Sequence, residues 1–114
     1  MDTNIVVLVG RLTKNAELSY ANNGAAICKL SLAINLRKKV GGEWTEDAHF
    51  FDIAYFSDKI APYLTKGKQI AVTGELRQHK WEKDGVTRSK VEVVAENIQL
   101  LGSAPKKEEE KDVF

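Results

Sequence analysis

The chain has 114 residues, of which 43% are hydrophobic and 29% charged, a composition that predicts one globular domain with a single modest core. The one cysteine, Cys28, cannot form an internal disulfide, and two histidines are too few to complete a metal site of usual spacing, so we expect no metal or cofactor. The lack of any run of 18 apolar residues and a start unlike a signal peptide predict a soluble, cytoplasmic protein with no membrane partner. The net charge of +1 by itself argues neither for nor against a nucleic-acid partner.

The first part of the chain predicts two long strands. Residues 4–12 form a β-branched run, typical of a strand that is buried on both faces or paired at a subunit contact, with Gly10 as a bulge or bend. Residues 17–20 are a short extended piece, and the residues after them predict a turn. Apolar and polar residues then alternate over 26–36, so this strand should turn one face to the core and the other to water.

A basic hairpin follows the second long strand. Arg37, Lys38 and Lys39 precede a Gly-Gly pair that predicts a tight turn, and Trp44 comes directly after it. Such a run suits a solvated surface. Cations beside an aromatic ring also suit a polyanion with bases that stack, and both interpretations stay open from the pattern alone.

The returning strand, residues 49–56, is the most aromatic part of the chain. Phe51 and Ile53 share one face, and Phe50 and Phe56 share the other. Either both faces pack, one on the core and one on a helix or partner, or Phe50 and Phe56 are free to stack on a ligand. The alternation does not decide between them.

Residues 57–64 predict a short helix with Ser57 as its N-cap, shortened or kinked by Pro62. The spacing of the apolar residues within this segment is three and four, which is the period of a helix face. Lysine and glycine at 66 and 67 are typical of its end.

The strand at residues 67–81 organises the rest of the chain. Ile70, Val72 and Leu76 share the core-facing parity. A cation, an imidazole and an indole then lie on the opposite parity, at Arg77, His79 and Trp81. Trp81 either covers the end of a small barrel or belongs to a binding surface.

A hairpin turn at Asp84-Gly85 and a last strand over 86–101 complete the predicted domain, residues 1–102. Residues 103–114 have no apolar face to bury, so we expect a disordered charged tail. Its tip, Asp112, Val113 and Phe114, is either a solvated terminus or a peptide whose phenylalanine enters a partner's pocket.

Five long strands, one short helix between the third and fourth, and hairpins after the second and fourth predict an all-β OB-fold, a five-stranded Greek-key barrel. This barrel serves many functions, so the fold by itself does not define the activity.

Several motifs make the interpretation more specific. They are the run at 4–13, Glu17-Leu18-Ser19-Tyr20, Leu30-Ser31-Leu32-Ala33, the segment at 63–67, the run at 72–77 and Lys80-Trp81. In this order and spacing, the chain resembles the bacterial single-stranded DNA-binding protein (SSB) family over residues 4 to about 101.

The resemblance implies sequence-independent binding and protection of single-stranded DNA during replication, recombination and repair, without catalysis. It implies that Phe50, Phe56 and Trp81 stack on bases, and Trp44 is a further candidate. For the phosphate backbone it implies Lys66, Arg77 and Lys80, to which the basic hairpin adds Arg37 and Lys38.

The resemblance also implies partners: a homotetramer of dimers that pair their first strands, with a dimer as the alternative, and replication and repair proteins at the C-terminal tip. The chain departs from the family at Arg37-Lys38-Lys39, where an aromatic residue is frequent, at Asn15-Ala16, where Asp-Pro is common, and in its short tail. These departures keep open a specialised relative from a phage, plasmid or primosome, including an RNA binder.

Two readings from other classes remain. A protein-interaction OB module would bury Phe50, Phe56 and Trp81 against a partner, and its binding would depend little on salt. A nuclease would need clustered acids for a metal, whereas Asp52 and Asp58 are isolated along the chain.

Overall fold

The structure is a computed structural model that describes residues 2–102, and strands dominate them. The elements are β1 (Val6–Leu12), β2 (Glu17–Tyr20), β3 (Ala26–Val40), β4 (Glu43–Tyr55), the 3-10 turn η1 (Ala61–Tyr63), β5 (Gln69–Lys83) and β6 (Val86–Leu100). The predicted tail and its tip, Asp112, Val113 and Phe114, lie outside the described residues. Among the described residues, no helix is long and apolar enough to span a membrane.

Five strands close into a barrel in the order β1, β5, β6, β4, β3. Neighbouring strands are antiparallel except β4 and β6, which run parallel from Ile53↔Val93 to Tyr55↔Ala95. The pairs Arg11↔Ala33 and Leu12↔Leu32 join β3 back to β1 and close the barrel. The short β2 extends the sheet along β3. The predicted all-β OB-fold is therefore confirmed.

Aliphatic side chains from all five barrel strands fill the interior. Leu32, Ile53, Ile70 and Val72 are completely buried, and Leu64 joins them from the turn after η1. Cys28 is also fully buried and packs as a small apolar core residue.

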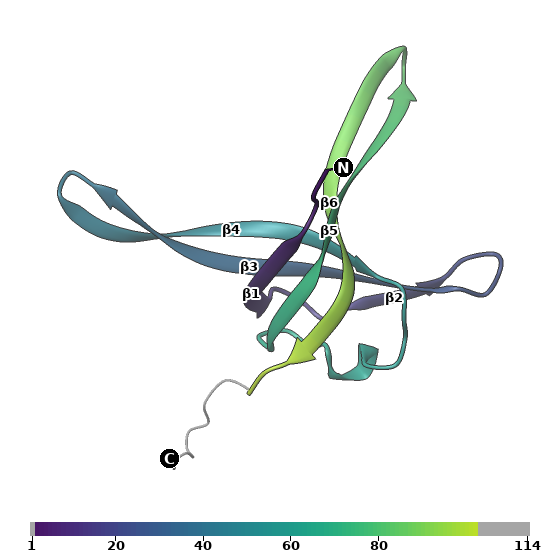
Figure 1. Cartoon of the computed structure of the whole chain (residues 1–114), viewed down its shortest axis with the longest axis horizontal. Coiled ribbons are helices and arrows are strands. Elements are labelled where there is room, and N and C mark those ends of the chain that lie inside the picture. Colours follow the sequence, from purple (N-terminus) through teal and green to yellow (C-terminus); the bar gives the residue numbers. More distant parts are fainter. Residues whose placement is uncertain (1, 103–114) are drawn as a thin grey trace.

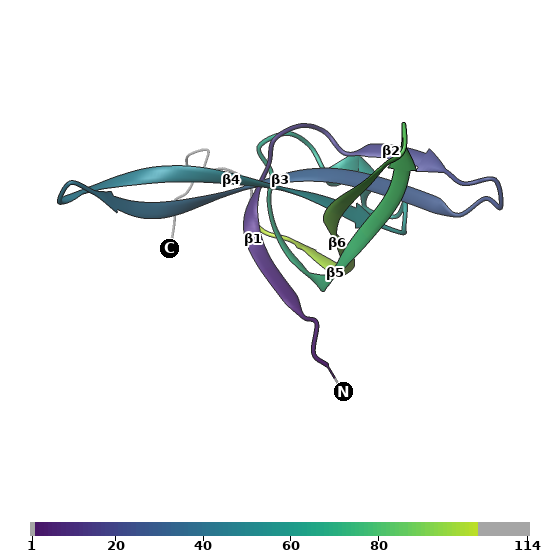
Figure 2. The same ribbon diagram turned by 90° about the horizontal axis from the view of Figure 1, so that it is seen from above.

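Two long hairpins leave the barrel, as Figures 1 and 2 show. We call residues 35–52 the β3–β4 arm and residues 76–91 the β5–β6 arm, because every residue in both ranges is exposed. The arms are two-stranded, so neither can enclose a core of its own.

Two-residue turns fix the register of both arms. Gly41 and Gly42 have φ of 59° and 85°, and Asp84 and Gly85 have φ of 54° and 75°. Positive φ at both central residues is the requirement of a type I′ turn, which suits the right-handed twist of the strands. Both predicted hairpins are confirmed.

Strand β1 differs from its prediction. Ile5, Val7 and Val9 are exposed by 71%, 65% and 50%, so burial on both faces is wrong, while a subunit contact remains a prediction. The register continues evenly through Gly10, which is therefore no bulge. A Cβ there would collide with the carbonyl oxygen of Ala33, because β1 and β3 cross closely at this point.

The helix predicted over 57–64 is only the single turn η1. Its N-cap residue, Ile60, provides no side-chain hydrogen bond, and Pro62 lies within the turn. Proline removes a backbone donor and limits helix growth. The hydroxyl of Ser57 instead accepts a hydrogen bond from the Lys59 N–H, closing a local turn.

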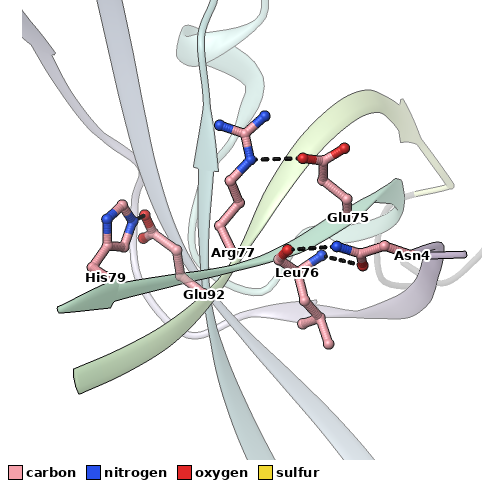
Figure 3. Close-up of polar contacts among 6 residues, drawn as sticks. All are labelled: Asn4, Glu75, Leu76, Arg77, His79 and Glu92. Carbon is pink, nitrogen blue, oxygen red and sulfur yellow. Dashed lines mark hydrogen bonds and ion pairs between the residues drawn. The ribbon is translucent and has the colours of Figure 1, made fainter. Parts of the chain in front are cut away.

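Leu76 was predicted to face the core but is 46% exposed. The last pair between β1 and β5 is Val6↔Gly74, so beyond it β6 alone flanks β5. The Asn4 side chain pairs with the backbone of Leu76 in place of a strand. Its Nδ2 donates to the Leu76 carbonyl (2.8 Å), and its Oδ1 accepts from the Leu76 N–H (2.9 Å), as Figure 3 shows. The β5–β6 arm begins there.

Candidate nucleic-acid interface

One face of the β5–β6 arm carries the residues singled out in the sequence. Arg77, His79 and Trp81 have the parity opposite to the core residue Val72, so they point away from the barrel interior. In register, they lie opposite Glu92, Lys90 and Arg88 of β6. The predicted grouping of cation, imidazole and indole is present.

Strand β4 continues this face. Phe50 and Asp52 have the parity opposite to the buried Ile53. Lys90 Nζ lies 2.9 Å from Asp52 Oδ2, which places the β6 cation against β4. We call the combined surface the outer face; it consists of Lys29, Phe50, Asp52, Arg77, His79, Trp81, Arg88, Lys90 and Glu92.

The aromatic residues of interest are exposed. Phe50 is 65% exposed and Trp81 is 44% exposed, and neither packs on the core. Trp81 therefore does not cover the end of the barrel, and Phe50 does not pack on the core of this chain, whereas packing of Phe50 and Phe56 on a partner stays a prediction. Phe56, directly after the end of β4, is 57% exposed.

The β3–β4 arm presents a second aromatic and cationic site. Trp44 pairs with Lys39, and its ring lies 4.9 Å from Arg37 Cζ and 5.7 Å from Lys39 Nζ, measured to the ring centroid. Both are cation–π contacts. By strand parity, Trp44 is on the same face of the ribbon as Phe50. This arrangement adds Lys39, which sequence reasoning had not selected.

Three predicted backbone contacts lie elsewhere. Lys38 is on the opposite face of its ribbon from Trp44, and Lys80 is on the opposite face of β5 from Trp81. Lys66 precedes β5, where its N–H donates to Asn15 Oδ1, at the far end of that strand from Trp81. The structure thus brings Arg77 and Trp81 together and separates these lysines from them.

One member of the outer face is a buried carboxylate that connects β3, β5 and β6. Glu92 is only 6% exposed and lies 2.5 Å from His79 Nε2 and 3.6 Å from Lys29 Nζ. These partners compensate the cost of burying a charged group. Figure 3 shows Glu92 beside His79, and the ion pair between Arg77 Nε and Glu75 Oε2, which are 2.6 Å apart.

Carboxylates thus hold several cations of the outer face. The hydrogen bond from Lys90 to Asp52, with the nearby negative charge, raises the pKa of the Lys90 ammonium, so this group is charged at neutral pH. The described residues contain no cluster of three or more metal-ligating side chains. The arrangement offers aromatic rings beside cations, which is the chemistry of a surface that binds single-stranded nucleic acid.

Comparison with known protein families supports the assignment of the outer face as a nucleic-acid binding surface. The model of the single-strand binding protein family matches residues 3–101. The chain is 56% identical over 105 residues to the single-stranded DNA-binding protein of Treponema pallidum, covering 90% of this chain and 60% of the relative. It is 40% identical over 107 residues to that of Borreliella burgdorferi, covering 90% and 72%. The chain thus spans about 60% of the length of the Treponema protein.

Solved structures agree in fold. An SSB from Plasmodium falciparum in complex with ssDNA has a TM-score of 0.80 at 22% identity, covering 90% of this chain and 97% of that one. A deletion mutant of the single-stranded DNA binding protein from Thermus aquaticus has a TM-score of 0.79 at 33% identity, covering 88% and 51%. With the family match over nearly all described residues, these findings establish that the chain belongs to the single-strand binding protein family.

Proposed function

We propose that the protein binds single-stranded DNA without sequence preference, by stacking bases on exposed aromatic rings and contacting phosphates with nearby cations. The observation that carries the proposal is the outer face itself, where Phe50 and Trp81 are exposed beside Arg77 and Lys90. Every base has a π face, so stacking tolerates any sequence, and each stacked base contributes about 1–3 kcal/mol.

Selectivity for single strands follows from the same geometry. A base paired within a duplex is already stacked on its neighbours and hydrogen-bonded, so it is not free to lie on Phe50 or Trp81. The phosphates of a duplex can still attract the cations, which gives weak, salt-sensitive binding.

In the cell, such a protein coats and protects single strands during replication, recombination and repair, acting in the cytoplasm on the nucleoid. We assign this binding to an OB-fold domain at 1–102, and recruitment of replication and repair proteins to the tail at 103–114. The names of the relatives support the DNA-binding part of this proposal.

Self-association is the second part of the proposal. The exposed apolar row Ile5, Val7 and Val9 on β1 is the surface through which two copies would pair, and two such dimers would form a tetramer. An exposed apolar strand is otherwise an aggregation hazard. A stable dimer is the alternative, and sedimentation of the purified chain distinguishes the two.

Fluorescence anisotropy with labelled oligo(dT) tests the proposed binding. We expect tight binding at low salt that weakens steeply as salt rises, and much weaker binding to duplex DNA of equal length. Equal affinity for both DNAs would contradict the stacking mechanism. Absence of binding to either would redirect the search to a protein ligand of the outer face.

A further inference from the structure

An open cleft of about 210 Å³ lies on the outer face, between β3, β4 and β6. Its charged lining consists of three lysines and three acids: Lys14, Glu17, Lys29, Asp52, Lys90 and Glu92. Each lysine is held by one acid, so the cleft is electrically compensated. None of these six residues was selected as a binding residue from the sequence.

Two of the carboxylates differ in how firmly they are held. Glu92 is buried and has two partners, His79 and Lys29, so its place between the strands is fixed. The Asp52 side chain is 53% exposed and pairs with Lys90, whose side chain is 50% exposed. Exposed ion pairs contribute little net stability, because water solvates the separated charges almost as well. The Asp52–Lys90 pair can therefore open at little cost.

The position of the Asp52–Lys90 pair favours a role in binding single-stranded DNA. Asp52 lies two residues from Phe50 on the same face of β4, and Lys90 lies two residues from Arg88, the residue in register with Trp81. A base stacked on Phe50 would bring its sugar-phosphate backbone to the mouth of the cleft. A phosphate arriving there would compete with the Asp52 carboxylate for the same ammonium group.

We propose that this cleft is a backbone-phosphate subsite, and that Asp52 acts as an internal substitute for phosphate which Lys90 exchanges for the DNA. This rests on the proposed function and deepens it: Asp52 lowers the affinity for single strands, because binding must break its pair with Lys90 and tolerate its negative charge. Removing that charge without changing the shape of the side chain should tighten binding.

The test compares Asp52→Asn with Asp47→Asn by anisotropy titration with labelled oligo(dT). Asp47 is a matched control: it lies on the same strand, its side chain is 50% exposed, and it faces away from Phe50 beside His49. Both substitutions remove one negative charge. We expect Asp52→Asn to tighten binding at least threefold more than Asp47→Asn does.

A double-mutant cycle with Lys90→Ala isolates the exchange. Lys90→Ala alone should weaken binding and reduce the salt slope by about 0.7, the value for one phosphate contact on a single strand. In the Lys90→Ala background, most of the gain from Asp52→Asn should disappear. Thermal unfolding of each variant checks that the fold is retained.

Several outcomes would overturn the subsite. They are equal affinities of Asp52→Asn and Asp47→Asn, an undiminished gain in the Lys90→Ala background, and an unchanged salt slope in Lys90→Ala. In all of these the wild-type chain still binds oligo(dT), so the proposed function survives. If the wild-type chain binds no oligo(dT), both the function and the subsite fail.

Discussion

Strands β3 to β6 each run through two regions that differ in burial. In the barrel they contribute Leu32, Ile53, Val72 and Val93, each no more than 2% exposed. In the arms the same strands consist only of exposed residues. A two-stranded ribbon cannot bury a core, so packing places few limits on the arm residues. Aromatic and charged residues gather there, and stability and binding should therefore respond to different substitutions.

The largest expected effect on stability is in the barrel. In Gly74→Ala, the new Cβ would collide with the carbonyl oxygen of Val94, so the strands must shift and the free energy of unfolding should fall by about 3 kcal/mol. Urea unfolding measures this loss. Gly102→Ala is the matched control, because a Cβ at Gly102 meets nothing within 4 Å. Equal stabilities of the two variants would contradict the close strand packing.

The largest expected effect on binding is in the β5–β6 arm. Trp81→Ala should weaken oligo(dT) binding about 5- to 150-fold, as loss of about 1–3 kcal/mol of stacking implies. Its free energy of unfolding should change little, because Trp81 packs on no core residue. Val40→Ala, which removes an exposed apolar side chain from the ribbon face opposite Trp44, serves as the control. A similar loss of affinity in both variants would refute the assigned face.

Adjacent lysines of the β3–β4 arm provide a finer comparison. Lys39→Ala removes a cation from the face of Trp44, whereas Lys38→Ala removes one from the opposite face. We expect the salt slope of oligo(dT) binding to fall by about 0.7 in the first variant and to stay unchanged in the second. The two slopes come from titrations at four or more salt concentrations. Identical slopes in the two variants would show that the DNA contacts both faces of this arm equally.

The smallest expected effect concerns thiol reactivity. Burial raises the pKa of the Cys28 thiol, so little thiolate exists at neutral pH and a disulfide reagent should react slowly until the barrel opens. A thiol introduced in the arm, Cys28→Ala with Ser89→Cys, should react at the rate of a free exposed cysteine. Absorbance of the thiolate that leaves the reagent during the exchange measures both rates. Fast reaction of native Cys28 would indicate a loosely packed barrel.

Strand periodicity predicted much of the barrel and part of the site. Alternation placed Phe50 opposite Ile53, and Arg77 with Trp81 opposite Val72, and the structure agrees. Alternation also placed Leu76 in the core, which is wrong. Pairing between β1 and β5 ends at Gly74, and a sequence pattern does not reveal where a neighbouring strand ends.

The sequence contains enough information to choose between Lys38 and Lys39 as the partner of Trp44. A two-residue turn at Gly41-Gly42 fixes Lys39 opposite Trp44, so parity alone would have selected Lys39 and rejected Lys38. In contrast, the Asp52–Lys90 pair depends on the parallel pairing of β4 with β6, two strands distant in sequence. No local pattern encodes that contact.

The central claim, that a single strand stacks on the outer face, is tested most directly by Trp44→Phe, which leaves Trp81 as the only tryptophan. Its fluorescence is followed during titration with oligo(dT) and with duplex DNA of equal length. The account predicts strong quenching by oligo(dT) that high salt reverses, and little quenching by the duplex. Binding of oligo(dT) without any change in Trp81 fluorescence would contradict it.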